Sequence, residues 1–224
     1  MYIPGELKED PLIAFFPSRV FVLLVSLVAV LVFIAPRSAT AGPLTDQVHE
    51  SVDAVLKLVS DPELKKEART VDRRRLIRQV AAELFDFTEI SQRSLGPHWR
   101  ARTPAEREEF IALFGDLLEY AYVSKIEMYS GETIRYLGES VDGPQGVVKT
   151  RIVLKQGTEV PVDYRMMQKS GRWAVYDVNI EGVSLVSNYR SQFNAVIQRS
   201  GYSDLVARLK TKQVERPGTE RATP

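Results

Sequence analysis

The sequence has no cysteine, only two histidines and almost no net charge, and each shortage excludes a class of function. Without cysteine the chain has no disulfide, no thiol nucleophile and no cysteine-ligated metal site. His49 and His98 fit no metal-binding spacing such as H-E-x-x-H. The 30 Lys and Arg residues nearly balance the 29 Asp and Glu residues, which argues against a nucleic-acid-binding protein. No G-x-S-x-G motif or glycine-rich phosphate loop occurs either. The composition therefore fits an ordinary globular chain of 224 residues without an evident catalytic motif.

The longest apolar run lies near the N-terminus. A single serine interrupts the residues from Val20 to Ala35, and the run is shorter than the roughly 20 residues typical of a membrane-spanning helix. Ala39-Thr40-Ala41 follows it with the small-x-small pattern of a signal-peptide cleavage site. We therefore predict export, with residues 1–41 as a signal peptide. Because the segment before the run is long and contains three acidic residues, an uncleaved N-terminal anchor is the alternative.

Helical periodicity dominates both ends of the remaining chain. The predicted helices span residues 44–59, 88–95, 103–129, 185–200 and 203–212. The third has the clearest start, because Thr103 and Glu106 form a capping box and Pro104 occupies the first helical position. We expect Thr88 and Ser203 to cap the second and the last helix. Together these signals predict one long central helix with shorter helices on both sides in sequence.

A strongly basic stretch, Lys65–Arg75, lies between the first two predicted helices. It is either a solvated helix face or a surface for anionic lipid or a protein partner.

Between residues 133 and 181 the apolar period changes from 3.6 to 2. The predicted strands span residues 133–137, 147–154, 159–169 and 172–181, with hairpin-length turns between them. In the fourth strand we expect Tyr176 and Val178 to share the covered face and Asp177 to point the other way. The prediction is an α+β fold in which an antiparallel sheet of about four strands packs against several helices. Its domain spans residues 42–212, and residues 213–224 form a disordered tail.

A catalytic interpretation has few residues available. The nearest acid–base set is His98, Asp177 and Glu181 with Tyr164 or Tyr176, and nothing in their spacing requires that they meet. A small α+β enzyme that uses His98 or Asp177 as its acid or base is therefore kept as the alternative function.

Apolar residues of the long helix, the 185–200 helix and the covered sheet face form either a solid core or the lining of a cavity. Periodicity does not distinguish the two. These residues are Phe114, Leu117, Leu118, Tyr122, Val148, Ile152, Tyr164, Met166, Tyr176, Val178, Val186, Tyr189 and Phe193.

Several stretches resemble the MlaC, or toluene-tolerance, family of periplasmic phospholipid-binding proteins. They are FDFTEISQRSLGPHWR (85–100), TPAEREEFIALFGDLL (103–118), YSGE (129–132), VPVDYRM (160–166) and WAVYDVNIEGVSLVSNYRSQF (173–193). The last stretch is long enough to be specific, and the resemblance runs from about residue 85 to about residue 210 in the same order.

The resemblance implies a curved sheet that encloses an apolar cavity with the helices, and a carrier without catalytic activity or cofactor. The apolar residues given above, together with Val183, are then expected to bind the acyl chains. Arg190 and Lys125 are the head-group candidates, although Arg190 could instead pair with Glu181. The implied partners are phospholipid, an inner-membrane ABC transporter complex and an outer-membrane lipoprotein complex. An adaptor that binds a membrane complex without lipid is a third possibility.

Overall fold

The computed structural model describes residues 42–214 of the chain. The predicted signal peptide or anchor, and nearly all of the predicted tail, lie outside the described residues. The helices are α1 (Pro43–Ser60), α2 (Thr70–Leu84), α3 (Phe87–Leu95), α4 (Pro104–Glu127), α5 (Leu185–Ser200) and α6 (Tyr202–Val214), with short 3-10 turns at Glu67–Arg69 and Gly96–Ala101. Within this part of the chain, no helix is both long enough and apolar enough to span a bilayer.

The sheet has its strands in sequence order, and every neighbouring pair is antiparallel. The strands are β1 (Thr133–Asp142), β2 (Gln145–Val153), β3 (Glu159–Lys169), β4 (Arg172–Ile180) and β5 (Val183–Ser184). The α+β class and the antiparallel sheet are thus confirmed. The predicted number of strands misses only β5, whose two residues are too few to give an alternating pattern.

A register shift in β4 overturns the predicted face of Tyr176. Arg165 of β3 lies opposite Asp177, and Met166 lies opposite Val175, so Tyr176 is an extra residue between two paired positions. Such a bulge inserts one unpaired residue and interrupts the alternation. Tyr176 therefore does not share the covered face with Val178 and lies beneath Arg93 of α3 instead. Asp177 is on the opposite face from Val178, as predicted, but it is buried there.

The start of α4 follows the predicted capping box. The Thr103 side chain accepts a hydrogen bond from the Glu106 backbone N–H, and the Thr103 N–H donates to Glu106 Oε2 at 2.7 Å. Two other predicted caps are wrong. Asp86, not Thr88, caps α3 by accepting from the Glu89 N–H at 2.9 Å. The last helix begins at Tyr202, one residue before Ser203.

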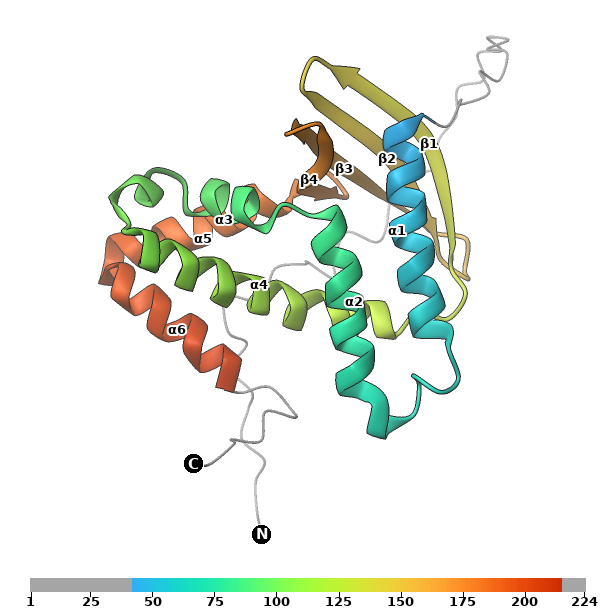
Figure 1. Cartoon of the computed structure of the whole chain (residues 1–224), viewed down its shortest axis with the longest axis horizontal. Helices are drawn as coiled ribbons and strands as arrows, with labels where there is room; N and C mark the ends of the chain where they lie inside the picture. Colours follow the sequence, from blue (N-terminus) through green and yellow to red (C-terminus); the bar gives the residue numbers. More distant parts are fainter. Residues whose placement is uncertain (1–41, 215–224) are drawn as a thin grey trace, which may run out of the picture. The chain divides into compact units, whose positions relative to one another are not determined.

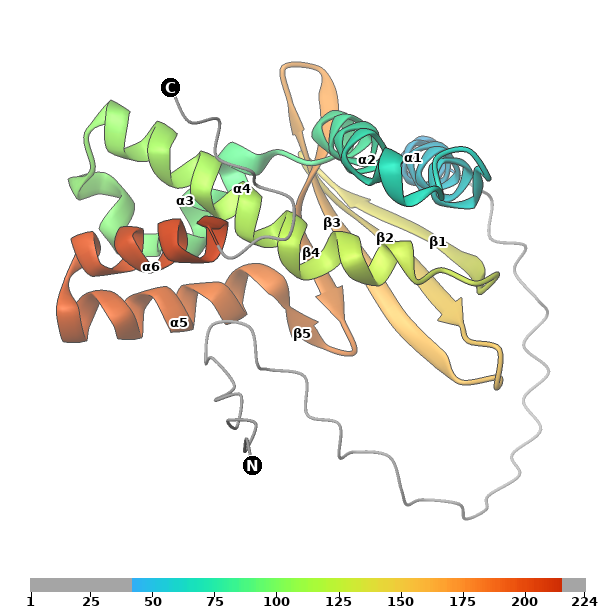
Figure 2. The same ribbon diagram turned by 90° about the horizontal axis from the view of Figure 1, so that it is seen from below.

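Two groups of elements lie side by side in the described part of the chain. The helices α1 and α2 cover one face of the sheet, whereas α3, α5, α6 and the first half of α4 form a helical group (Figures 1 and 2). We call the covered face the inner face. The second half of α4 runs from the helical group toward α1 and α2 (Figure 2).

Each group has its own set of buried apolar residues. The helical core consists of Ile90, Leu95, Trp99, Phe110, Leu113, Phe114, Leu117, Leu118, Val186, Tyr189, Phe193, Leu205, Val206 and Leu209. The sheet core consists of Leu44, Val48, Leu84, Val148, Met166 and Val175. Phe85, in the link between α2 and α3, packs against both cores.

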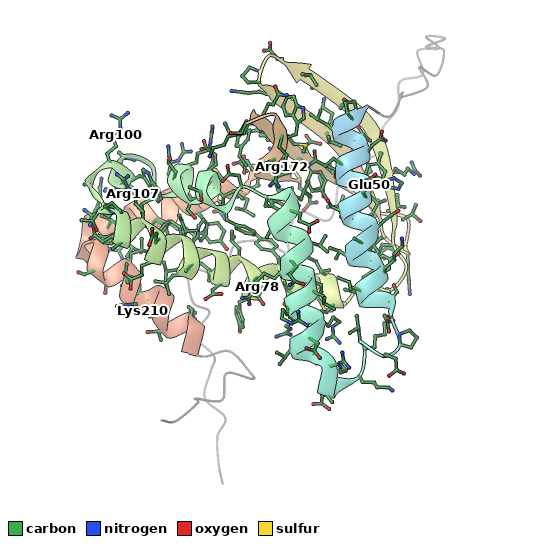
Figure 3. All side chains as sticks on the ribbon, viewed as in Figure 1. Glu50, Arg78, Arg100, Arg107, Arg172 and Lys210 are labelled. Atoms are coloured by element: carbon green, nitrogen blue, oxygen red, sulfur yellow. The ribbon has the colours of Figure 1, made fainter. Side chains whose placement is uncertain are left out.

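Two arginines of the basic stretch, both in α2, contact α4. Arg73 and Arg74 both bind Glu127, with closest N–O distances of 2.7 and 2.8 Å. One helical turn further on, Arg78 pairs with Glu119 of α4, and Figure 3 places this side chain where the two helices approach each other. These pairs tie the covering helix α2 to the helix that continues into the helical core.

Candidate functional site

The residues predicted to contact lipid divide between the two cores. Phe114, Leu117, Leu118, Val186, Tyr189 and Phe193 belong to the helical core, and Tyr122 packs against it. Val148 and Met166 belong to the sheet core, and Tyr164 and Val178 pack against it. The structure therefore brings these residues together as two sets and not as one continuous lining.

The helical core is built around a group of four aromatic rings. The centroids of Phe110, Phe114 and Phe193 are 5.0–5.7 Å apart, and the Tyr189 ring lies 4.9 Å from Phe114 and 5.5 Å from Phe193. Edge-to-face and offset contacts at such distances are the favourable arrangements for aromatic pairs. All three Phe side chains are fully buried. Direct ring-to-ring packing thus fills the centre of this core.

Two tyrosines, Tyr122 and Tyr189, lie at one end of the helical core. At this end α4 continues beyond the core toward α1 and α2 (Figure 2). Burial raises the pKa values of Tyr122 and Tyr189, and their hydroxyls share a hydrogen bond. The ammonium group of Lys125, one helical turn after Tyr122, lies 5.7 Å from the centre of the Tyr122 ring. One head-group candidate is therefore next to a pair of buried hydroxyls.

The sheet core is lined differently. Val148 and Met166 are fully buried on the inner face of β2 and β3, and Tyr164 of β3 lies opposite Val148 on one side and Val178 on the other. Burial raises the pKa of Tyr164 to about 12, so its hydroxyl stays protonated at physiological pH. Aliphatic side chains and tyrosines, with Phe85 and Trp173 packed against them, thus form the sheet core.

The two groups meet at a buried carboxylate. Asp177, which is 4% exposed, accepts hydrogen bonds from Ser184 Oγ at 2.6 Å and from the Val186 backbone N–H at 3.0 Å. Arg165 lies 3.4 Å from the same carboxylate. Since a helix N-terminus carries unpaired N–H groups and partial positive charge, the carboxylate is well placed there. Asp177 thus fixes the turn from β4 into α5.

Three residues of the predicted lipid set lie outside both cores. Ile152 is half-buried in β2. Val183, in β5, is 46% exposed. The Tyr176 ring lies 4.2 Å beneath the guanidinium of Arg93 from α3, so the bulge turns it toward a cation.

Arg190 has a structural contact that the sequence did not indicate. Its Nε donates to the Arg93 backbone carbonyl at 2.8 Å, which caps the last turn of α3. A side chain at Gly96 would meet the Arg190 stem at 3.4 Å, so a glycine there leaves room for this approach. The alternative partner Glu181 lies in a left-handed turn, with φ at 51°.

The residues of the enzyme alternative do not assemble. The His98 ring is hydrogen-bonded to Asn194 Oδ1 at 2.9 Å, whereas Asp177 binds the opposite end of the same helix at Val186. These two positions are about 12 Å apart along α5. Among residues 42–214 there is also no group of acidic or histidine side chains that could hold a metal ion. An acid–base pair of His98 and Asp177 is therefore absent from the described structure.

Two functional contacts of β1 were not found from the sequence. Glu139 Oε2 accepts hydrogen bonds from the Thr45 N–H at 2.7 Å and the Thr45 hydroxyl at 2.8 Å, and so caps α1. Its carboxylate occupies the position where a side chain at residue 42 would be, so a larger residue than Gly42 would displace this cap. Tyr136 lies on the same face and packs against the sheet core. Alternation around a predicted strand of 133–137 could have identified Tyr136, but not Glu139 beyond the bulge.

Comparison with known proteins gives consistent matches. The sequence model of the family described as MlaC protein matches residues 49–211. The chain is 25% identical over 186 residues to the intermembrane phospholipid transport system binding protein MlaC of Haemophilus influenzae, covering 80% of this chain and 86% of that protein. It is 26% identical over 103 residues to the toluene tolerance protein ttg2D of Pseudomonas putida, covering 46% of this chain and 48% of that protein.

A solved structure matches across nearly its whole length. It is a phospholipid-binding protein from Ralstonia solanacearum, determined in complex with a phospholipid. The TM-score is 0.68 at 28% sequence identity, and the match covers 76% of this chain and 96% of that one. The arrangement of helices and sheet described above is thus that of a protein crystallised with lipid.

Proposed function

The chain belongs to the MlaC family, and from this membership we propose that it is a phospholipid carrier of the periplasm. It would move lipid between an outer-membrane lipoprotein complex and an inner-membrane ABC transporter complex, and so help maintain outer-membrane lipid asymmetry. The proposal needs no cofactor and no catalytic step. The predicted export of the chain agrees with this location.

The observation that carries the proposal is the likeness to the lipid-bound protein from Ralstonia solanacearum. Because 96% of that chain is covered, the likeness extends over nearly the whole of that protein and not only over a shared sheet. The names of the two relatives, a phospholipid transport protein and a toluene tolerance protein, support the same function.

We propose that the acyl chains lie along the inner face of the sheet. The side chains of Tyr164, Met166 and Val178 belong to this face. Asp177, which precedes Val178 in β4, accepts a hydrogen bond from the Val186 N–H and so connects the strand to the start of α5. Aliphatic side chains adapt to an apolar guest more easily than a closed stack of rings does. The helical core would then hold the fold, while its Tyr122 and Tyr189 mark the boundary with the lipid.

The energetic reason for a carrier is the cost of exposing acyl chains. Two chains contain roughly 30 methylenes, and at about 0.8 kcal/mol each their exposure to water costs on the order of 24 kcal/mol. An enclosing apolar surface removes most of that cost without requiring a particular head group. Near the end of the chains, Lys125 is the first head-group candidate, since it lies beside the tyrosine pair. Arg190 is the weaker head-group candidate, because its Nε is already used in the hydrogen bond to the Arg93 carbonyl of α3.

Lipid extraction from the purified protein tests the proposal. Residues 42–224 are expressed behind a heterologous signal peptide for export, purified without detergent and analysed by native mass spectrometry, and we expect a phospholipid adduct on the folded protein. Val178→Asp places a charge on the inner face and should empty it, whereas His98→Ala should retain the wild-type amount. Folded protein that carries no phospholipid would overturn the proposal and favour an adaptor. Val178→Asp must be shown to fold by circular dichroism before its lipid content is compared.

A further inference from the structure

One buried polar atom on the inner face of the sheet has no hydrogen-bond partner. It is the hydroxyl of Tyr136 in β1, which is shielded from solvent and bonds to no group within residues 42–214. An unpaired buried donor usually costs about 1–3 kcal/mol, so such atoms in native structures call for an explanation. The hydroxyl lies among apolar side chains, since the Tyr136 ring packs against the sheet core.

The polar groups around this hydroxyl are already engaged. Thr150, which lies opposite Tyr136 in the register of β1 and β2, donates its own hydroxyl to the Val162 carbonyl at 2.7 Å. The His49 ring meets the Tyr136 ring edge-on, with centroids 4.7 Å apart, and pairs with Asp53 at 3.6 Å. The Tyr136 hydroxyl is therefore held in place by its ring contacts while its hydrogen bond remains unmade.

This hydroxyl keeps its proton and is therefore available as a hydrogen-bond donor. Burial, with smaller contributions from Tyr164 and Asp53, raises the pKa of Tyr136 well above its ordinary value, so the group keeps its proton. The surrounding side chains are those of Leu44, Val48 and Val148, and a phosphate charge among them would be strongly disfavoured. A carbonyl oxygen is the acceptor that suits such an apolar setting.

We propose that the Tyr136 hydroxyl donates a hydrogen bond to an ester carbonyl of the bound diacyl lipid. This inference rests on the proposed carrier function and assigns the glycerol-ester region of the cargo to the part of the inner face where β1 meets α1. The acyl chains would then cross the inner face obliquely from Tyr136, which lies opposite Thr150, to the adjacent row of Val148, Tyr164 and Val178, whose members lie opposite one another in β2, β3 and β4. Diacyl lipids would be selected over lipids that lack ester carbonyls.

The test compares Tyr136→Phe with the wild type on two lipids that differ only in their linkage. Delipidated protein is titrated with a diester phosphatidylglycerol and with its diether counterpart, in competition with a fluorescent phospholipid. We expect Tyr136→Phe to bind the diester lipid roughly threefold to tenfold more weakly, the effect of losing one hydrogen bond. Both proteins should bind the diether lipid equally, at the weaker level. Tyr120→Phe, the same change at a partly exposed position of α4, should alter neither affinity.

A second measurement separates cargo recognition from a structural role. The delipidated Tyr136→Phe protein should unfold at the wild-type urea concentration or a higher one, because no hydrogen bond within the protein is lost and an unpaired buried hydroxyl is removed. A lower midpoint together with unchanged lipid affinity would mean that the hydroxyl serves the fold, and this outcome overturns the inference. Equal wild-type affinity for the two lipids would also overturn it but leave the carrier function standing. A wild type that binds neither lipid would reject both.

Discussion

The helical core and the sheet core are both buried and apolar, but they differ in what fills them. Four rings in direct contact occupy the centre of the helical core, and its Tyr189 hydroxyl bonds to Tyr122. The sheet core holds aliphatic side chains and the tyrosines Tyr136 and Tyr164, and the hydroxyl of Tyr136 is unpaired. Buried atoms without a partner also occur in the helical group, at Ser94 Oγ and Gln192 Oε1, but the four stacked rings contact one another directly, whereas in the sheet core the unpaired hydroxyl belongs to one of the aromatic rings themselves. This difference suggests that one core stabilises the fold and the other receives the cargo.

Truncation of one buried side chain in each core should separate these two roles and give the largest effect. Phe193 and Met166 are both fully buried, one in each core. Phe193→Ala should lower the free energy of unfolding by about 3–5 kcal/mol, because it leaves a cavity within the ring stack. Urea denaturation measures this loss, and native mass spectrometry of the folded fraction should still find wild-type lipid occupancy.

Met166→Ala is the partner variant. Its loss of stability should be about 2–4 kcal/mol, with a clear fall in the lipid bound per folded molecule. The comparison fails if Phe193→Ala empties the folded protein while Met166→Ala keeps its lipid.

The junction between the two cores should show the next largest effect. Asp177→Asn keeps the shape of the side chain but removes the charge that binds Ser184 and the Val186 N–H at the start of α5. Hydrogen bonds to a charged group contribute about 1.5–3 kcal/mol, so a loss of about 2 kcal/mol is expected in urea unfolding. Asp163→Asn, at a half-buried position of the adjacent strand, is the control and should cost less than 0.5 kcal/mol. Equal losses would mean that the junction does not depend on Asp177.

The strand around Asp177 also shows a limit of prediction from the sequence. Strict alternation assigned Tyr176 to the covered face, and the bulge opposite Arg165 and Met166 overturned this. It placed Asp177 correctly on the opposite face from Val178, but it did not reveal that the start of α5 buries Asp177 there. A bulge depends on pairing with the neighbouring strand, which the residues of β4 alone do not reveal. By contrast, the capping box of Thr103 and Glu106 is local in sequence, and it was predicted correctly.

In the candidate site, too, features that depend on local sequence were predicted, and features that depend on contacts between distant residues were not. Helical and strand periodicity identified which residues of α4, α5, β2 and β3 are buried, and most of them are. It did not reveal that they form two cores, because that depends on how α4 passes from one group to the other. The role of Arg190 at the Arg93 carbonyl was missed for a similar reason, since the two residues are 97 positions apart.

The attachment of α2 to α4 should give a smaller, pH-dependent effect. Burial of Glu127 raises the pKa of its carboxyl, but hydrogen bonds from Arg74 and Arg73 outweigh this and lower the pKa below its usual value of 4.5. Glu127→Gln should cost about 1–2 kcal/mol at neutral pH, less than for a fully buried pair, because the side chain of Glu127 is still 13% exposed. Arg75→Gln, on the same helix but paired only with Asp72, is the control.

The pH profile gives the sign of this contribution. A carboxyl whose pKa is lower in the folded state stabilises the protein above its unfolded pKa, and this stabilisation is lost as the pH falls through the folded value. The difference in unfolding free energy between wild type and Glu127→Gln should therefore stay constant above about pH 5 and shrink at lower pH. A difference that persists at pH 3 would show that the loss comes from packing and not from charge.

The smallest expected effect distinguishes the two head-group candidates, Lys125 and Arg190. We expect one to contribute to lipid binding and the other to the stability of the fold. Lys125 lies at the tyrosine boundary of the helical core, whereas Arg190 is tied to the end of α3. Lys125→Gln should weaken binding of an anionic phospholipid by about twofold to threefold at low salt, with less effect at high salt because exposed charges are screened. Arg190→Gln should instead lower the free energy of unfolding by about 0.5 kcal/mol and leave lipid affinity unchanged. The reverse result would place the head group beside α3, and the acyl chains would then have to enter through the helical core.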